Sequence, residues 1–210
     1  MRHSTVMIAG GGFAGLACAK ALAERGVDVC LLERKKAAGV GMHTTGIIVK
    51  ECAEEFALPA NLTHRVTNVR LYAPNMRHID LTSPDYFFLT TDTPALMRHL
   101  SEEAARAGAQ ILFDTPYEFA RPRGTGIIVN GLYGVDFLVG ADGPRSKVAE
   151  DFSLGRNTQF LLGAEAEYTG IALPETGGER PFFCFLDQHI SHGYLGWVIP
   201  GVGVTQVGIA

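Results

Sequence analysis

The sequence predicts an α/β protein in which strand–helix–strand units are interleaved with a second, mostly antiparallel β region. A short apolar run at 5–9 leads into a glycine-rich turn and then a helix, and a second apolar run follows at 27–33. After residue 65, several segments alternate in polarity or run apolar over the length of a strand. The first pattern predicts parallel strands with a connecting helix, and the second predicts added antiparallel sheet.

The glycine-rich turn has the spacing G-x-G-x-x-G at Gly10, Gly12 and Gly15. Gly10 permits a tight strand-to-helix turn, Gly12 lets the main chain approach a pyrophosphate, and Gly15 lets the helix lie close to the sheet. The first helical turn, with Phe13 and Ala14, offers unpaired N–H groups and the positive end of the helix dipole. The loop therefore predicts a Rossmann-like dinucleotide site.

Glu33 ends the second predicted strand, 23 residues after Gly10. An acid at about this distance binds the ribose hydroxyls in dinucleotide-binding folds. Glu33, followed by Arg34, favours an unphosphorylated ribose, so the residues indicate FAD or NAD rather than NADP. A secretory signal is the rival interpretation of the first residues, but the clustered glycines make a poor helical core for one.

Composition limits the class of protein. The chain has 210 residues, 47% hydrophobic and 19% charged, with a net charge of −4. This predicts a globular protein and gives no indication of a nucleic-acid partner, and no apolar run reaches the ~18 residues of a transmembrane segment. The four cysteines show neither CxxC nor metal-ligand spacing, which predicts reduced, buried thiols in a cytoplasmic protein without a metal site.

A second motif lies at 136–149, where a short strand runs into a Gly-Ala-Asp-Gly turn and a helix that starts near Ser146. It resembles the second fingerprint of the FAD-dependent hydroxylase and geranylgeranyl reductase superfamily, whose members are p-hydroxybenzoate hydroxylase-like flavoproteins. The matching positions are Asp136, Phe137 to Val139, Gly140, Ala141, Asp142, Gly143, Arg145, Ser146 and Val148. The family's final arginine is replaced by Ala149.

The resemblance implies FAD as the cofactor, with NAD(P)H as a candidate electron donor. It implies that Asp142 and Gly143 approach the ribityl and pyrophosphate region of FAD. It also places 39–51 in the loop beneath the flavin ring, where Thr44, Thr45 and Gly46 are expected to supply main-chain N–H groups to the flavin or to a substrate. His43 is interpreted as a polar loop histidine, with proton donor or flavin attachment point as the alternative; no catalytic acid or base is assigned.

The resemblance further implies two domains that interleave along the chain. Residues 1–65 and 91–155 are expected to form the Rossmann-like FAD-binding domain. Residues 66–90 and 156–210 are expected to form a β-sheet substrate domain for a small apolar organic substrate.

A signature strand separates the subfamilies. Geranylgeranyl reductases carry Gly-Tyr-x-Trp-x-Phe-Pro, and alignment on Trp197 and Pro200 places Leu195 at the tyrosine position and Ile199 at the phenylalanine position. Tyr194 falls one residue early, which on a strand is the opposite face. The partial match favours the reductase branch, and hydroxylation stays open.

The family's third FAD contact, a Gly-Asp-Ala-like motif, would follow the strand near the last residues of this sequence. The chain is therefore expected to be truncated, a fragment or one part of a split protein, with a C-terminal half or a second chain to complete it. The expected function is that of an FAD-dependent oxidoreductase. The alternatives are a dinucleotide-binding module without turnover of its own and an NAD-dependent dehydrogenase.

Overall fold

The computed structural model describes residues 2–42 and 44–210, which form two compact units. Unit 1 contains the residues up to 42 and 94–158, and unit 2 contains those between 42 and 94 and 159–210. None of the helices among the described residues is long and apolar enough to cross a membrane. The elements are β1 (Arg2–Ala9), α1 (Phe13–Ala23), β2 (Val29–Leu32), β3 (Ile47–Val49), α2 (Lys50–Glu55), a 3-10 turn (Ala60–Leu62), β4 (Thr63–Val66), β5 (Asn68–Tyr72), β6 (His78–Thr82), β7 (Phe88–Thr91), α3 (Thr93–Arg106), β8 (Gln110–Leu112), β9 (Ala120–Arg123), β10 (Gly126–Val129), β11 (Tyr133–Gly140), α4 (Lys147–Asp151), β12 (Ala164–Tyr168), β13 (Phe182–Phe185), β14 (Gly196–Pro200) and β15 (Thr205–Ile209).

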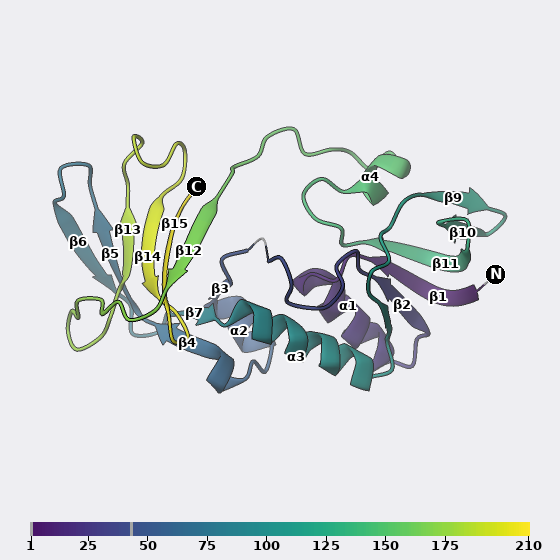
Figure 1. The fold of residues 1–210 in the computed structure, drawn as a ribbon, viewed down its shortest axis with the longest axis horizontal. Helices are drawn as coiled ribbons and strands as arrows, with labels where there is room; N and C mark the ends of the chain where they lie inside the picture. Colours follow the sequence, from purple (N-terminus) through teal and green to yellow (C-terminus); the bar gives the residue numbers. More distant parts are fainter. Residues whose placement is uncertain (1, 43) are drawn as a thin grey trace. The chain divides into compact units, whose positions relative to one another are not determined.

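Unit 1 is built on a six-stranded sheet in the order β8-β2-β1-β11-β10-β9 (Figure 1). The strands β8, β2, β1 and β11 are parallel, and β10 and β9 add an antiparallel hairpin. Ala9 lies opposite both Leu32 and Gly140 in the register. The parallel strands therefore end together at one edge of the sheet.

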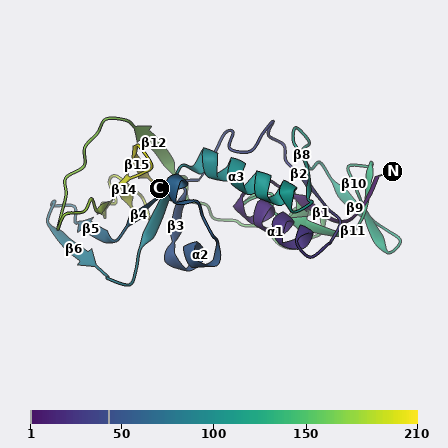
Figure 2. The same ribbon diagram turned by 90° about the horizontal axis from the view of Figure 1, so that it is seen from below.

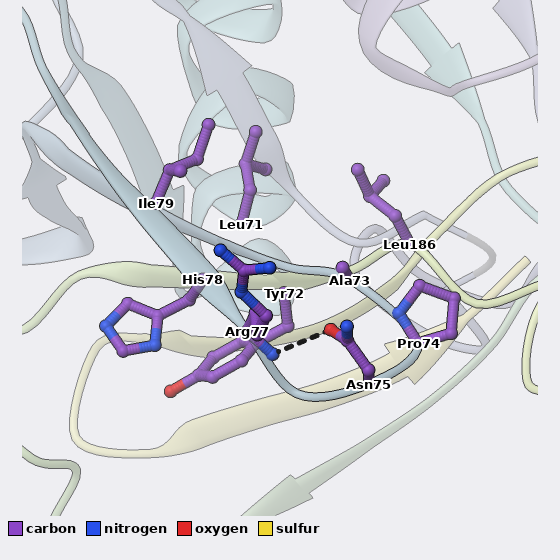
Figure 3. Close-up of a pocket in the computed structure, with 9 residues that line it drawn as sticks. All are labelled: Leu71, Tyr72, Ala73, Pro74, Asn75, Arg77, His78, Ile79 and Leu186. Carbon is purple, nitrogen blue, oxygen red and sulfur yellow. Dashed lines mark hydrogen bonds between the residues drawn. The ribbon is translucent and has the colours of Figure 1, made fainter.

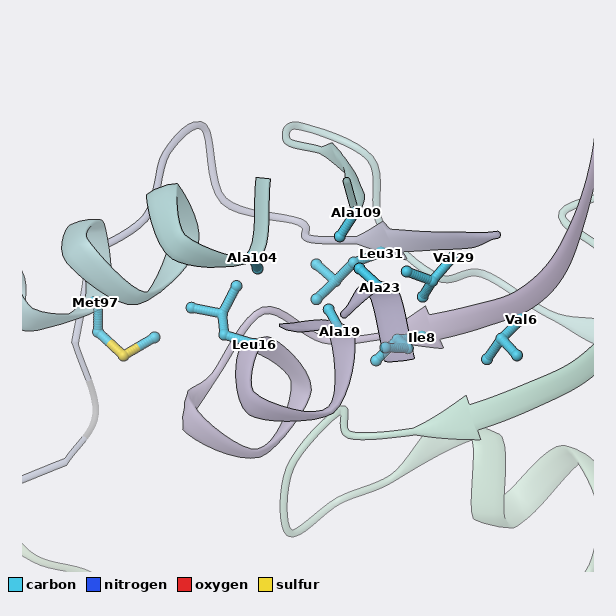
Figure 4. Packing of buried hydrophobic residues seen from close by; sticks show 10 residues of the cluster. All are labelled: Val6, Ile8, Leu16, Ala19, Ala23, Val29, Leu31, Met97, Ala104 and Ala109. Atoms are coloured by element: carbon cyan, nitrogen blue, oxygen red, sulfur yellow. The ribbon is translucent and has the colours of Figure 1, made fainter. Parts of the chain in front are cut away.

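Helices α1 and α3 pack on one face of this sheet and lie side by side (Figure 2). The buried core between helices and sheet combines residues of both (Figure 4): Val6, Ile8, Leu16, Ala19, Ala23, Val29, Leu31, Met97, Ala104 and Ala109. Lys20 of α1 also donates to Glu103 of α3 at 2.5 Å. The two helices thus cover the apolar strands on this face, and a second cluster with Met7, Cys30 and Leu32 buries the alternate side chains of β1 and β2.

The inner face of α1 is wider than expected. Spacing predicts that Gly15, Cys18, Ala19 and Leu22 face the sheet; Gly15 and Ala19 are buried, and Cys18 and Leu22 are partly buried and pack against the core. Leu16 and Ala23 are buried as well. Leu16 adds apolar area that the small residues lack.

Unit 2 contains a six-stranded sheet in the order β12-β15-β14-β13-β5-β6 and a three-stranded sheet β3-β7-β4. The larger sheet is antiparallel except where β13 runs parallel to β5. Val66 of the smaller sheet and Trp197 and Ile199 of the larger one form a buried core of unit 2, with Ile47 and Phe182 packed against them. The antiparallel β region expected from the sequence is therefore present.

The boundaries of the compact units differ from the expected domain ranges in one segment. Residues 44–65 fall within the expected first domain, but β3 and β4 pair with opposite edges of β7. Strand pairing ties these residues to unit 2. The other two boundaries lie within three residues of those expected. The second segment of unit 1 begins at 94 instead of 91, and it ends at 158 instead of 155.

Two long apolar stretches expected as strands are hairpins. In the stretch 66–82, Val66 ends β4, and residues 68–82 form β5 and β6 around a turn at 73–77, where Met76 has φ 62°. Residues 193–210 form β14 and β15, and Gly201 donates to the Val204 carbonyl in the turn at 2.8 Å.

Strand β11 is less enclosed than its apolar sequence suggests. The run Phe137 to Val139 predicts a buried strand, but Phe137 is 63% exposed. Among the described residues, β10 pairs only with Tyr133–Val135, so the same edge of 136–140 has no strand partner. The expectation of burial is wrong for Phe137, whereas Leu138 and Val139 are partly buried and pack against the core, and Val148 of α4 lies against Gly140.

The four cysteines differ in burial, which gives a chemical test of the described core. Burial raises the pKa of Cys184 to about 12 and, aided by Asp28 and opposed by Arg2, raises the pKa of Cys30 to about 11. Cys52 is exposed, contrary to the expectation that all four thiols are buried.

We expect a thiol reagent near neutral pH to modify Cys52 promptly and the buried Cys30 and Cys184 only on unfolding. The thiolate is the reactive form, and the raised pKa values keep the two buried thiols protonated. Cys52→Ser should remove the fast phase; rapid modification of Cys184 in the folded chain would contradict the described core.

Candidate dinucleotide site

Three segments with predicted site residues meet at the carboxyl edge of the unit 1 sheet. The Gly10–Gly15 loop follows β1, Glu33 and Arg34 follow β2, and Asp142 and Gly143 follow β11. These strands are neighbours in the order β2-β1-β11 and end in register. Ligands of open α/β sheets bind at this edge.

Gly10 and Gly15 are required by close packing of main chain against main chain. Gly10 has φ +105°, and a Cβ there would overlap the carbonyl oxygen of Ala141. A Cβ on Gly15 would overlap the carbonyl oxygen of Gly10 and lie 3.4 Å from the Ala141 side chain. The two glycines therefore let the loop, α1 and the Ala141 turn pack together.

Gly12 faces open space. It is the N-cap of α1 with φ −79° and ψ −175°, and its carbonyl accepts from Leu16 N–H at 2.9 Å. No heavy atom of the described residues lies within 4 Å of where its Cβ would stand. The N–H groups of the first helical turn, including Phe13 and Ala14, have no i−4 carbonyl to bind. This space and these donors fit the pyrophosphate of a dinucleotide.

Phe13 and Ala14 contribute differently to this turn. The Phe13 side chain is partly buried against the core, so its main chain is what it offers at the site. Ala14 is exposed, and its small side chain leaves the helix start accessible.

Glu33 is held by two main-chain donors. Its Oε2 accepts from Gly11 N–H at 2.7 Å and its Oε1 from Lys35 N–H at 2.8 Å, while the residue is only 9% exposed. An ionised carboxylate has about four lone-pair sites, so both oxygens keep capacity for ribose hydroxyls. Arg34, beside it, is exposed.

Asp142 organises the start of α4. Its Oδ1 accepts from Ser146 Oγ at 2.6 Å, and its Oδ2 accepts from the N–H groups of Lys147 and Val148 at 2.7 and 3.0 Å. Ser146 in turn accepts from Ala149 N–H. The helix start near Ser146 is confirmed. The carboxylate therefore shapes the turn, and Gly143 follows it with φ +91° and open space around it.

Thr45 and Gly46 belong to unit 2, so the structure places them in a different compact unit from the glycine loop. Gly46 has φ +65°, and its carbonyl accepts from Thr91 Oγ1 at 2.9 Å. The Thr45 carbonyl accepts from Gln206 Nε2 at 3.4 Å. His43 lies outside the described residues.

The signature strand of unit 2 is β14. Trp197 is 5% exposed, lies against Gly208 and donates from Nε1 to Glu165 Oε2 at 2.9 Å. Burial raises the pKa of Glu165, and this hydrogen bond opposes the rise. Tyr194 is 58% exposed and precedes the strand, so it is not part of this buried row.

Unit 2 also carries a groove of about 470 Å³ at the β5–β6 hairpin (Figure 3). Leu71, Ile79 and Leu186 give it an apolar wall, and Arg77 and His78 add polar groups. Arg77 N–H donates to Asn75 Oδ1 at 3.1 Å and so closes the turn.

Two groups of contacts could not be expected from the motif alone. The N–H of Gly11, a variable position in the motif, holds Glu33, and the main chain of Thr115 donates to the Glu33 carbonyl at 2.9 Å. The threonines at 91 and 93 are both buried. The polar run Thr90–Thr93 at the end of an apolar strand is the one sequence feature that marks them.

Fold and site together define a dinucleotide-binding α/β protein with an added antiparallel β unit. A family model described as "FAD binding domain" matches residues 3–163. The chain therefore belongs to this FAD-binding family, which makes FAD the dinucleotide.

Relatives and solved structures agree with this family. The chain is 28% identical to the chloroplastic geranylgeranyl diphosphate reductase of Oryza sativa, covering 99% of this chain and 49% of the relative. It is 26% identical to digeranylgeranylglycerophospholipid reductase 2 of Methanosphaera stadtmanae, covering 100% and 57%. The chain thus spans about half the length of these curated relatives.

Two solved structures share the fold. A geranylgeranyl bacteriochlorophyll reductase-like protein of Thermoplasma acidophilum superposes with a TM-score of 0.79 at 21% identity, covering 100% of this chain and 56% of the other. The p-nitrophenol 4-monooxygenase of Pseudomonas putida gives 0.72 at 14% identity, covering 100% and 58%. The expected fold class, a Rossmann-like FAD-binding region with an added β region, is confirmed.

Proposed function

We propose that this chain is the FAD-binding part of a flavin-dependent oxidoreductase that reduces an apolar organic substrate at a carbon–carbon double bond. The main support is the convergence of the Gly10–Gly15 loop, Glu33 and the Asp142–Gly143 turn at one sheet edge, beside open space at Gly12. When bound, FAD supplies the hydride chemistry, and the protein supplies binding and orientation.

The residues of unit 1 have separate roles in this proposal. The first-turn N–H groups of α1 bind the pyrophosphate, and Gly12 leaves the room for it. Glu33 binds the adenosine ribose with the lone pairs that Gly11 and Lys35 leave free, and exposed Arg34 lies at the adenosine end. Asp142 fixes the turn that presents Gly143 to the ribityl and pyrophosphate region.

Unit 2 is proposed to bind the substrate and the flavin ring. Thr45 and Gly46 supply main-chain groups to the flavin, and the antiparallel sheet binds the substrate. The apolar wall of Leu71, Ile79 and Leu186 suits a hydrocarbon chain. Both curated relatives described above are named as reductases of geranylgeranyl compounds, which favours reduction over hydroxylation. A cytoplasmic location and NAD(P)H as electron donor belong to the same proposal.

Further polypeptide is proposed to complete the active enzyme, either a C-terminal half or a second chain. The relatives are about twice as long, and the half-open β11 with exposed Phe137 supplies an unfilled surface in unit 1. The second candidate function is a dinucleotide-binding module without turnover. It is supported by the same finding, that the chain spans only about half the length of these relatives.

Reconstitution with FAD tests the proposal. The purified chain, mixed with FAD and freed of excess, should keep the visible absorption bands of an oxidised flavin, and an anaerobic reductant should bleach them. A colourless chain that retains ADP would favour the module. A chain that retains neither FAD nor ADP would overturn the proposed function.

A further inference from the structure

Gly46 is held between two buried threonines of unit 2. Thr91 is 1% exposed and Thr93 is 4% exposed, and their hydroxyls lie 2.9 Å apart. Thr91 Oγ1 also lies 2.9 Å from the Gly46 carbonyl oxygen, to which it donates. Gly46 has φ +65°, and any Cβ there would overlap both hydroxyls. The position therefore accepts only glycine, and the threonine pair fixes its carbonyl.

A second strand holds the preceding residue. Gln206 on β15 is 1% exposed, and its Nε2 donates to the Thr45 carbonyl at 3.4 Å and to Glu167 Oε1 at 3.2 Å. Its Oε1 has no hydrogen-bond partner among the described residues. A buried amide that leaves one group unpaired weakens stability. Stability alone therefore does not account for Gln206.

These contacts orient a peptide group. The Thr45 carbonyl and the Gly46 N–H share one planar peptide and point in opposite directions. Because Gln206 binds the carbonyl, the Gly46 N–H points away from Gln206. Its acceptor within the loop is Thr44 Oγ1 at 3.4 Å, which is longer than the usual 2.7–3.2 Å. This hydrogen bond is therefore weak, and the N–H can exchange it for a closer acceptor.

We infer that Thr91 and Gln206 are positioning residues that hold the Thr45–Gly46 peptide so that its N–H donates to an electron-rich atom of the flavin ring. The inference rests on the proposed function, in which Thr45 and Gly46 contact the flavin. Thr91 and Gln206 act in this inference through the peptide, since their hydrogen bonds go to the Gly46 and Thr45 carbonyls. A donor fixed in advance stabilises negative charge on its acceptor without reorganisation.

Thr90 provides a matched control on the same strand. It follows Leu89 in β7, is 0% exposed, and donates from Oγ1 to the Pro200 carbonyl at 2.7 Å. Replacing Thr91 by valine removes its hydrogen bonds to the Gly46 carbonyl and the Thr93 hydroxyl. Replacing Thr90 by valine likewise removes a buried hydroxyl with two contacts, to the carbonyls of Pro200 and His64. Only Thr91 contacts Gly46, so a purely structural role predicts equal effects and a positioning role predicts unequal ones.

The experiment compares Thr91→Val, Thr90→Val and Thr91→Ser in the full chain reconstituted with FAD. We expect Thr91→Val to weaken FAD affinity about tenfold, to shift the visible flavin spectrum, and to speed amide exchange at 45–47 in the FAD-free chain. Thr90→Val should leave all three at wild-type values. Thr91→Ser should restore them, because it keeps the hydroxyl. If Thr91→Val does not fold, Gln206→Met tests the same peptide from β15 with the same expected changes.

The results separate the two proposals. Equal changes in Thr90→Val and Thr91→Val, or wild-type affinity, spectrum and exchange in Thr91→Val, would overturn the positioning role while FAD binding stands. Failure of Thr91→Ser to recover the spectrum would also overturn it. A wild-type chain that binds no FAD would overturn the proposed function, and this inference with it, before any variant is compared.

Discussion

Gly12→Val is expected to abolish FAD retention while the chain stays folded. The valine side chain would occupy the open space at the start of α1, where the pyrophosphate is proposed to bind. The extended backbone of Gly12 suits valine, so the cost to folding is limited to a poorer helix N-cap, about 1 kcal/mol. Equilibrium dialysis of FAD and thermal unfolding of the FAD-free chain measure the two effects separately.

Gly15→Ala is the matched comparison for this variant. Its Cβ would overlap the Gly10 carbonyl oxygen, so it should lower the unfolding temperature even without cofactor. Gly12→Ala should fall between wild type and Gly12→Val in FAD affinity, because its side chain is smaller. Normal FAD retention by Gly12→Val would remove the α1 N-terminus from the site.

Glu33→Ala is expected to weaken FAD binding by about 1–3 kcal/mol, the range for a hydrogen bond to a charged group. The variant removes the carboxylate proposed to bind the ribose. It also leaves the N–H groups of Gly11 and Lys35 without their acceptor, so some loss of stability accompanies the loss of affinity. Titration with FAD and with ADP should show similar losses, because the proposed contact lies in the half that the two ligands share.

The control for Glu33 is Glu24→Ala at the end of α1. Glu24 is exposed, and its ion pair with Lys20 spans 3.8 Å, so little energy depends on it. FAD affinity in this variant should match wild type. Equal affinity in Glu33→Ala and wild type would exclude Glu33 from the ribose contact.

The part of the site that follows from local sequence could be predicted. Gly10, Gly12, Gly15 and Glu33 are recognisable because strand, turn, helix and second strand are consecutive, and the parallel register then brings their ends together. The Asp142 turn and the cap at Ser146 are also local, since the two residues are four apart and hydrogen-bonded.

Long-range pairing accounts for what the sequence did not show. Strand β3 has only three residues and β4 is mixed in polarity, and only pairing with β7 assigns them to unit 2. The hairpin of β9 and β10 was not expected, because its proline and arginine residues weaken the strand pattern. The contact from Gln206 to Thr45 joins residues far apart in sequence, so no periodicity indicates it.

The open half of β11 has a consequence for work in solution. Main-chain groups along one edge of 136–140 lack a strand partner among the described residues, and Phe137 exposes its ring beside them. Such an edge is a template for another copy of the same chain. Self-association would therefore grow with protein concentration and compete with any ligand measurement, so dilution series are the natural form for titrations of this chain.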